Sequence, residues 1–105
     1  MSEPFQAITN VDRLVHEPAR LAILTALEAC VRADFMYLQA LTGLSKGNLS
    51  LHLGKLEARG LIAIQKTFAG KTPRTVVRLT KAGKTAIRDY WCRLEKTRRQ
   101  ALKWA

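Results

Sequence analysis

Apolar residues recur at the three- and four-residue spacing of one helix face in several segments of the chain. Leu24, Leu27 and Val31 follow this spacing in the first third of the sequence. Pro18 suits the first position of a helix, because its missing N–H would have no partner there. We therefore predict a helix from Pro18 to Val31, with a short helical piece over residues 8–15 before it.

Two short predicted helices flank a tight turn in the middle of the chain. Residues 35–41 are sufficient for two helical turns, and Gly43 is a natural C-terminal stop. Ser45 follows as an N-cap, and the helix that it starts runs to about Arg59 and ends at Gly60. Two helices joined in this way form a helix-turn-helix unit.

The C-terminal half changes from helical to β periodicity and back. Residues 61–68 and 75–79 are rich in β-branched and aromatic side chains, and residues 69–74 separate them, which predicts a hairpin with a basic tip. Thr80 can cap a last helix over about residues 81–103. The predicted fold class is mainly α with a small β-hairpin, which must lean on the helices to be stable.

The chain has 105 residues, which predicts a single domain over residues 1–105. Its 18 Lys and Arg residues against 8 Asp and Glu give a net charge of +10, concentrated towards the C-terminus, which favours a polyanionic partner. The sequence has neither a membrane-spanning apolar run nor a secretory signal, so we expect a cytoplasmic protein. Cys30 and Cys92 are then expected to be small core residues, with an intersubunit or redox-active thiol as the alternative.

The helix that starts at Ser45 has an outer face that stability alone does not explain. Its two interior glycines cost about 1 kcal/mol each relative to alanine, and an outward leucine gains little in water. Close approach of DNA accounts for both features, with lysines at phosphates and polar side chains at base edges. We predict a buried face of Leu49, Leu53 and Leu56, and a half-buried His52 for which a phosphate contact is the weaker alternative. The predicted DNA contacts in this segment are Ser45, Lys46, Gly47, Asn48, Ser50, Leu51 and Lys55.

The hairpin adds a second set of predicted DNA contacts. A basic loop beside a helix in the major groove can reach the neighbouring minor groove, where arginine is the favoured side chain. Arg74 is the first candidate, because Pro73 restricts the loop and limits the entropy lost on insertion. A merely solubilising loop is the alternative. The predicted contacts here are Lys66, Lys71, Arg74 and Arg78.

The run from Gly43 to Ile62, GLSKGNLSLHLGKLEARGLI, resembles the helix-turn-helix signature of bacterial and archaeal winged-helix transcriptional regulators. Residues 73–75 and 79–83 are similar to the wing and the following helix start of the same group, and residues 17–20 to its opening motif. The resemblance covers about residues 14–94 and is closest to small single-domain regulators allied to the MarR and ArsR types.

This resemblance implies a winged helix-turn-helix fold and a homodimeric, sequence-specific DNA binder, often a repressor. Residues 45–59 would lie in the major groove, and residues 66–78 would form the wing at the minor groove. Asp34 and Met36 stand where metal-sensing ArsR-type repressors place two thiolates, which disfavours metal sensing at that position. Two His and two scattered Cys have no zinc-site spacing, so we expect no metal and no cofactor.

The last helix, about residues 81–105, has more aromatic residues than one small domain needs and is long enough to project beyond the core. An apolar stripe exposed in this way usually marks an interface, so we predict a twofold homodimer on a pseudo-palindromic operator. The alternative is that the stripe folds back on its own core. The predicted interface residues are Ile87, Tyr90, Trp91, Leu94, Ala101 and Trp104.

Three other functions are alternatives to DNA binding. The eight acidic residues are dispersed and no catalytic or nucleotide-binding motif occurs, so we do not expect an enzyme. A winged-helix protein–protein interaction module and an RNA-binding protein are the alternatives that remain open. The sequence names no small-molecule effector.

Overall fold

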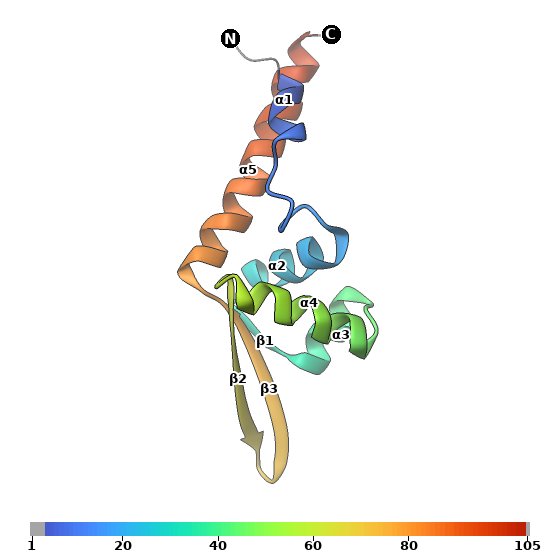
Figure 1. Ribbon diagram of the computed structural model, residues 1–105, viewed down its shortest axis with the longest axis vertical. Helices are drawn as coiled ribbons and strands as arrows, with labels where there is room; N and C mark the ends of the chain where they lie inside the picture. Colours follow the sequence, from blue (N-terminus) through green and yellow to red (C-terminus); the bar gives the residue numbers. More distant parts are fainter. Residues whose placement is uncertain (1–3, 105) are drawn as a thin grey trace.

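The computed structural model describes the backbone of residues 4–104 and the side chains of residues 5–103. It consists of helices around a core and a small antiparallel sheet (Figure 1). The elements in chain order are α1 (Pro4–Thr9), α2 (Pro18–Cys30), β1 (Arg32–Asp34), α3 (Phe35–Thr42), α4 (Lys46–Ala58), β2 (Ile62–Ala69), β3 (Thr72–Leu79) and α5 (Lys81–Trp104).

The helix ends follow from local sequence. Pro18 opens α2, and the carboxylate of Glu17 accepts hydrogen bonds from the backbone at its first turn. Gly43 ends α3 in the left-handed conformation, with φ +71°. Ser45 caps α4 by accepting a hydrogen bond from the Asn48 N–H at 3.2 Å, as predicted.

The sheet has three strands in the order β1-β3-β2, so the predicted hairpin gains a partner strand. The strands of the hairpin are also longer than predicted. Gly70 has φ +65°, which permits a turn of Gly70 and Lys71 alone, and residues 69 and 72 already pair. The predicted loop over residues 69–74 is therefore wrong, and Pro73 lies in β3 where β2 is its only neighbour.

The N-terminal prediction also needs correction. The helix lies at Pro4–Thr9, and residues 10–17 form turns instead of the predicted helix over 8–15. The reason is local, because the Asp12 carboxylate accepts a hydrogen bond from Leu14 N–H at 2.9 Å and so competes with a helical arrangement. Val15 from this segment is nonetheless buried in the core.

The core lies where the three central helices meet the sheet and α5. Apart from Val15, its fully buried side chains come from α2, α3, α4, β3 and α5, so each of these elements has one face fixed by apolar burial. The largest are Ile23, Leu24, Leu27, Leu38, Leu49, Leu56 and Ile87.

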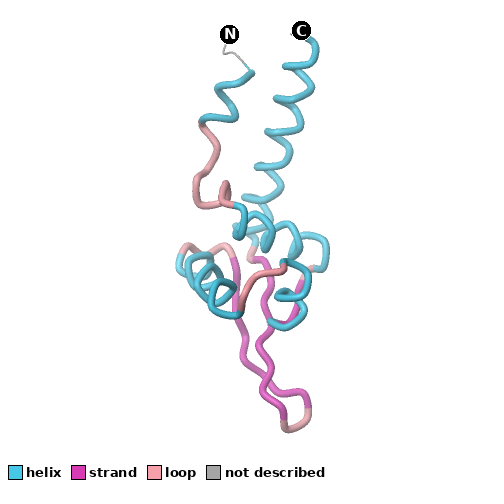
Figure 2. Tube along the Cα trace, turned by 90° about the vertical axis from the view of Figure 1, so that its right-hand side faces the viewer, coloured by secondary structure: helices cyan, strands magenta, loops and turns pink. Residues whose placement is uncertain are grey.

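Two parts project from this body in opposite directions, which gives extents of 58 × 24 × 20 Å. One is the wing, formed by β2, β3 and their turn. The other is the arm, formed by α1 and the part of α5 over residues 91–104, which pack side by side (Figures 1 and 2). The start of α1 and the end of α5 lie together at the tip of the arm, at the opposite end of the molecule from the turn of the wing (Figure 1).

Candidate nucleic-acid interface

Helix α4 presents two distinct faces. Leu49, Leu53 and Leu56 are buried, as predicted from their spacing. The residues predicted to contact DNA point the other way and are all exposed, with Leu51 at 54% of its full exposure. A leucine in this position gains little from the fold of its own chain. The exposed set is Ser45, Lys46, Gly47, Asn48, Ser50, Leu51 and Lys55.

The two glycines of α4 have no structural use within the chain. Both have ordinary helical backbone, and a Cβ built on Gly47 or Gly54 would meet no atom within 4 Å. Alanine would therefore fit at either position and would favour the helix by about 1 kcal/mol. No side chain covers the outer surface of α4 at Gly47 and Gly54, so a partner could approach the helix backbone closely there.

The structure brings predicted residues from two separate segments into one groove. This groove, of about 800 Å³, lies between α4 and the wing. Lys46 and Ser50 line it from α4, and Lys66 and Arg74 line it from the two strands of the wing. Met36, which is 79% exposed, lines the groove from α3 and was not predicted as a DNA contact. Three cations from distant parts of the chain thus share one concave surface.

Arg74 occupies a different position from the predicted one. It lies within β3, opposite Thr67 of β2, and not in a loop at the tip. Its Nη2 atom lies 3.1 Å from Oδ2 of Asp34, so the side chain forms an ion pair across the sheet. Restriction of a loop by Pro73 is therefore not the reason for any role of Arg74. The side chain is still about half exposed, at 49%.

The other wing residues are spread from turn to base. Lys71 lies in the turn, Lys66 in the middle of β2, and Arg78 near the base of β3, opposite Arg32 of β1; Lys66, Lys71 and Arg78 are exposed. Phe68, next to the turn, is 69% exposed. Sequence reasoning assigned Phe68 only to a strand, because alternation does not distinguish the two faces of a strand that projects from the body.

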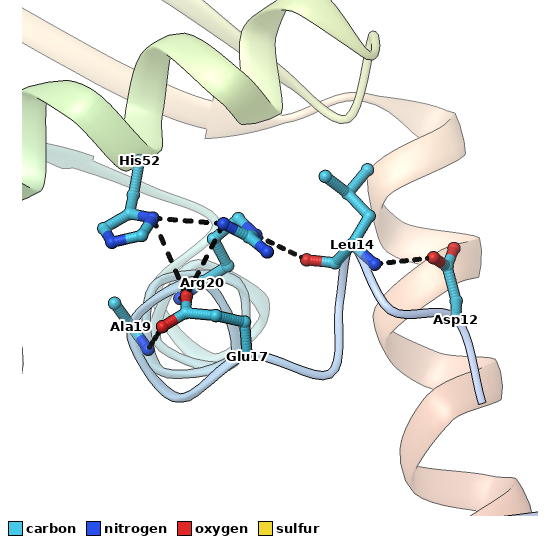
Figure 3. A network of polar contacts seen from close by, with 6 residues as sticks. All are labelled: Asp12, Leu14, Glu17, Ala19, Arg20 and His52. Atoms are coloured by element: carbon cyan, nitrogen blue, oxygen red, sulfur yellow. Dashed lines mark hydrogen bonds and ion pairs between the residues drawn. The ribbon is translucent and has the colours of Figure 1, made fainter. Parts of the chain in front are cut away.

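His52 of α4 points inward towards the start of α2 (Figure 3). Its Nδ1 atom lies 3.3 Å from Nη1 of Arg20 and 3.6 Å from Oε2 of Glu17. Arg20 also donates a hydrogen bond from Nε to the carbonyl oxygen of Leu14 at 2.6 Å. These contacts connect α4 to the segment that joins α1 to α2, so His52 faces away from the exposed surface of α4. Sequence analysis predicted the partial burial of His52 but not this network.

The carboxylate of Glu17 is the electrostatic centre of the network. Burial by itself would raise its pKa, but hydrogen bonds from the backbone N–H groups of Arg20 and Ala19, with the charges of His52 and Arg20, lower the pKa below its ordinary value of 4.5. The ionised carboxylate therefore holds the first turn of α2 at neutral pH.

The predicted dimer residues divide into two groups. Ile87 is fully buried and Tyr90 is 6% exposed within the chain itself, and the Tyr90 hydroxyl lies 2.7 Å from Nδ1 of His16. These two belong to the core, so their assignment to an interface is wrong. Trp91, Leu94 and Ala101 are half-buried on the arm, and the side chain of Trp104 lies outside the described residues.

The two cysteines have different environments, and neither lies in a cluster of metal-ligating side chains among the described residues. Cys30 is half-buried, but Cys92 is exposed on α5, which corrects the prediction of a core residue. At about 100° per residue, Cys92 lies on the side of α5 opposite the buried Ile87 and Tyr90, so it faces solvent. Among the described side chains, no three His, Cys, Asp or Glu residues lie together as a metal site. None of the described helices is both long and apolar enough to cross a membrane.

Comparison with protein families gives a match over most of the chain. Residues 19–97 match the family model described as a winged helix DNA-binding domain. An uncharacterised protein of Methanocaldococcus jannaschii is 36% identical over 70 residues, which are 67% of this chain and 73% of that protein.

Solved structures share the same arrangement of elements. A transcriptional regulator homologue of Pyrococcus horikoshii superposes with a TM-score of 0.84 at 28% identity, over 93% of this chain and 96% of that one. The transcriptional repressor CouR, bound to a DNA duplex, superposes with a TM-score of 0.75 at 17% identity, over 95% of this chain and 68% of that one. MarR-family transcriptional regulators are also among the chains with this fold.

Proposed function

The chain belongs to the family of winged helix DNA-binding domains, and on this premise we propose that it is a homodimeric, sequence-specific transcriptional repressor. Its family and fold are those of a DNA-binding transcriptional regulator and not of an enzyme. In the proposal, α4 enters the major groove of duplex DNA and the wing follows the adjacent minor groove. The cytoplasm, where a regulator meets its operator, is the proposed location.

One observation carries this proposal. The outer face of α4 combines Gly47 and Gly54, which leave open space around the backbone, with the exposed Leu51 and flanking lysines. The fold of the chain uses none of these features, whereas a DNA major groove uses all of them. Glycines permit close approach, lysines meet phosphates, and leucine can contact a thymine methyl group.

The groove between α4 and the wing supports the same function. Lys46, Lys66 and Arg74 surround it from both sides, as a phosphate backbone passing between a recognition helix and a wing would require. Asn48 and Ser50 are placed on the exposed side of α4, where they can reach base edges. Lys71 lies in the turn at the tip of the wing, between β2 and β3.

The arm is the proposed site of dimerisation. Ile8 is 41% exposed and Leu102 is 65% exposed there, beside the half-buried Trp91 and Leu94. Apolar side chains on a projecting pair of helices are typical of a surface that a second copy covers. A twofold dimer would place two α4 helices about one helical turn of DNA apart on a pseudo-palindromic operator.

Selection from a random duplex library tests sequence specificity directly. We expect a consensus with two related half-sites, and binding to this consensus whose log K falls linearly with log salt concentration. Truncation of Lys55 should reduce the slope by about one unit, and truncation of Arg74 by a smaller amount, because its ion pair with Asp34 already neutralises part of its charge. Leu51→Ala should relax sequence preference by about 1 kcal/mol at one position. Recovery of single-stranded RNA in preference to duplex DNA, or no salt dependence at all, would contradict the proposal.

A further inference from the structure

Helix α5 carries a charge that the proposed interface does not use. Its sequence contains eight Lys and Arg residues against Asp89 and Glu95. All eight basic side chains are exposed, and none forms an ion pair with a described acidic side chain. Helix α1, which packs along the distal part of α5, has no charged residue in its sequence. Asp89 and Glu95 offset only two of these eight charges, so α5 has a net charge of +6.

The positions of these cations are ordered along the helix. At about 100° per residue, five of them share the side of α5 opposite the buried Ile87 and Tyr90. With a rise of about 1.5 Å per residue, this side presents cations over about 33 Å. We call these residues the arm stripe: Lys81, Arg88, Lys96, Arg99 and Lys103.

The distal part of the arm stripe points away from the proposed DNA interface. Lys96, Arg99 and Lys103 lie about 14 to 24 Å beyond Ile87 along the helix axis, towards the tip of the arm. The wing projects from the other end of the molecule (Figure 1). A straight duplex held by α4 and the wing therefore cannot also contact these three cations.

We propose that the arm stripe binds the phosphate backbone of a second segment of duplex DNA, so that one protein dimer bridges two duplexes. This inference rests on the proposed function, because the first duplex is the one held by α4. A straight row of cations on a rigid helix can lie along a duplex, which presents one negative charge per about 1.7 Å of its axis and so a phosphate within reach of each cation.

Other polyanions fit the arm stripe less well. None of its described side chains is aromatic, so it has no platform on which single-stranded bases could stack. The apolar side of α5 is occupied by the core and by α1, so it is not available for insertion into a lipid surface. Duplex DNA needs neither feature.

Dimerisation leaves the arm stripe accessible. Two such rows of unpaired cations cannot face each other without a counter-charge, because like charges repel at short range. At about 100° per residue, Leu102 lies beside the stripe and not within it, and with the exposed Ile8 of α1 it offers a neutral surface for a second copy. The stripes of both protomers would then remain on the outside of the dimer.

A capture assay with the full chain tests the inference. A biotinylated duplex of mixed sequence is held on beads, loaded with protein, and offered a fluorescent second duplex, and both bound protein and captured fluorescence are measured. The arm variant carries the double substitution Lys96→Gln and Arg99→Gln. The matched control carries Arg13→Gln and Arg32→Gln. Both pairs remove two exposed, unpaired arginine or lysine charges, and the second pair lies outside α5.

The expected result is about a tenfold loss of second-duplex capture in the arm variant at equal bound protein, with the control close to the unsubstituted chain. Equal capture by all three proteins, or equal loss in both variants, would overturn the inference but leave the proposed function intact. Failure of the unsubstituted chain to bind the first duplex would overturn both the inference and the proposed function. Capture of RNA or of anionic vesicles through Lys96 and Arg99, without capture of a duplex, would also overturn the inference. Circular dichroism verifies that both variants keep their helix content.

Discussion

The Nδ1 atom of His52 lies 3.3 Å from Nη1 of Arg20, which places the inner side of α4 in contact with the first turn of α2 (Figure 3). The same arginine donates to the carbonyl oxygen of Leu14, in the segment that leads to the arm. One side chain therefore contacts both the helix proposed to read DNA and the connection to the proposed dimer surface. The orientation of α4 relative to the arm depends on this contact.

Arg20→Met should lower the free energy of unfolding by about 2 kcal/mol. The substitution keeps an aliphatic stem but leaves the Leu14 carbonyl oxygen without its charged donor, and hydrogen bonds to charged groups contribute about 1.5 to 3 kcal/mol. Arg13→Met is the control, because Arg13 is exposed and should change stability by no more than about 0.5 kcal/mol. Urea denaturation of both variants measures the difference, and equal effects would rule out a structural role for Arg20.

Glu17→Gln should make stability less dependent on acid pH. Because the pKa of Glu17 is lowered in the folded chain, its ionised form stabilises the fold above its ordinary pKa of 4.5, and this contribution is lost as the pH falls through the folded value. The difference in unfolding free energy between the unsubstituted chain and the variant should be constant above about pH 5 and shrink towards about pH 3. Urea denaturation over this range measures the difference, with Glu28→Gln, at an exposed position of α2, as the control for the loss of one carboxylate.

The helical part of the fold could be predicted from the sequence because it depends on near neighbours. The spacing of Leu49, Leu53 and Leu56 identifies the buried face of α4, and Ser45 marks the start of that helix through a contact three residues away. Such local signals survive in any tertiary context that buries the same face.

The remaining features depend on contacts between distant residues. Strand β1 has three residues and exists through its pairing with β3, so periodicity cannot reveal it. The position of Arg74 is set by its pairing with Thr67 and by the carboxylate of Asp34, which lies forty residues earlier. Ile87 and Tyr90 follow the same helical stripe as Leu94, and only the packed structure shows which part of the stripe is covered.

Asp34→Asn should tighten binding to duplex DNA by a few-fold at low salt. The Asp34 carboxylate pairs with Arg74 inside the groove, so it competes with phosphate for this cation and repels the backbone of DNA. Asparagine still accepts the hydrogen bond from Tyr37 N–H at the start of α3, so the helix cap is retained. Loss of an exposed ion pair should cost less than about 1 kcal/mol of stability.

Titration of a fluorescent duplex at several salt concentrations measures this effect. The salt dependence should become steeper by about one unit, because Arg74 then releases one more counterion on binding. Asp89→Asn removes the same charge from α5, away from the groove, and serves as the control. Equal tightening in both variants would mean that only net charge matters and that Arg74 is not freed.

Gly83 and Gly47 should respond in opposite ways to alanine. A Cβ on Gly83 would overlap the carbonyl oxygen of Leu61, so Gly83→Ala forces the start of α5 away from the residue that precedes β2 and should destabilise the fold by about 1 to 3 kcal/mol. A Cβ on Gly47 meets open space, so Gly47→Ala should raise the free energy of unfolding by up to about 1 kcal/mol.

Gly47→Ala can separate an effect on DNA binding from an effect on stability, because the two are expected to change in opposite directions. If duplex DNA packs against the backbone of α4, the added methyl group holds the helix away from the groove and should weaken binding about tenfold, even though the protein is more stable. Melting temperature and duplex affinity of the same preparation measure both effects. Ala40→Gly, on the exposed side of α3, provides the reverse control, since it should lower stability with little change in affinity. A Gly47→Ala variant that is more stable and binds DNA equally well would show that this face of α4 does not approach the duplex closely.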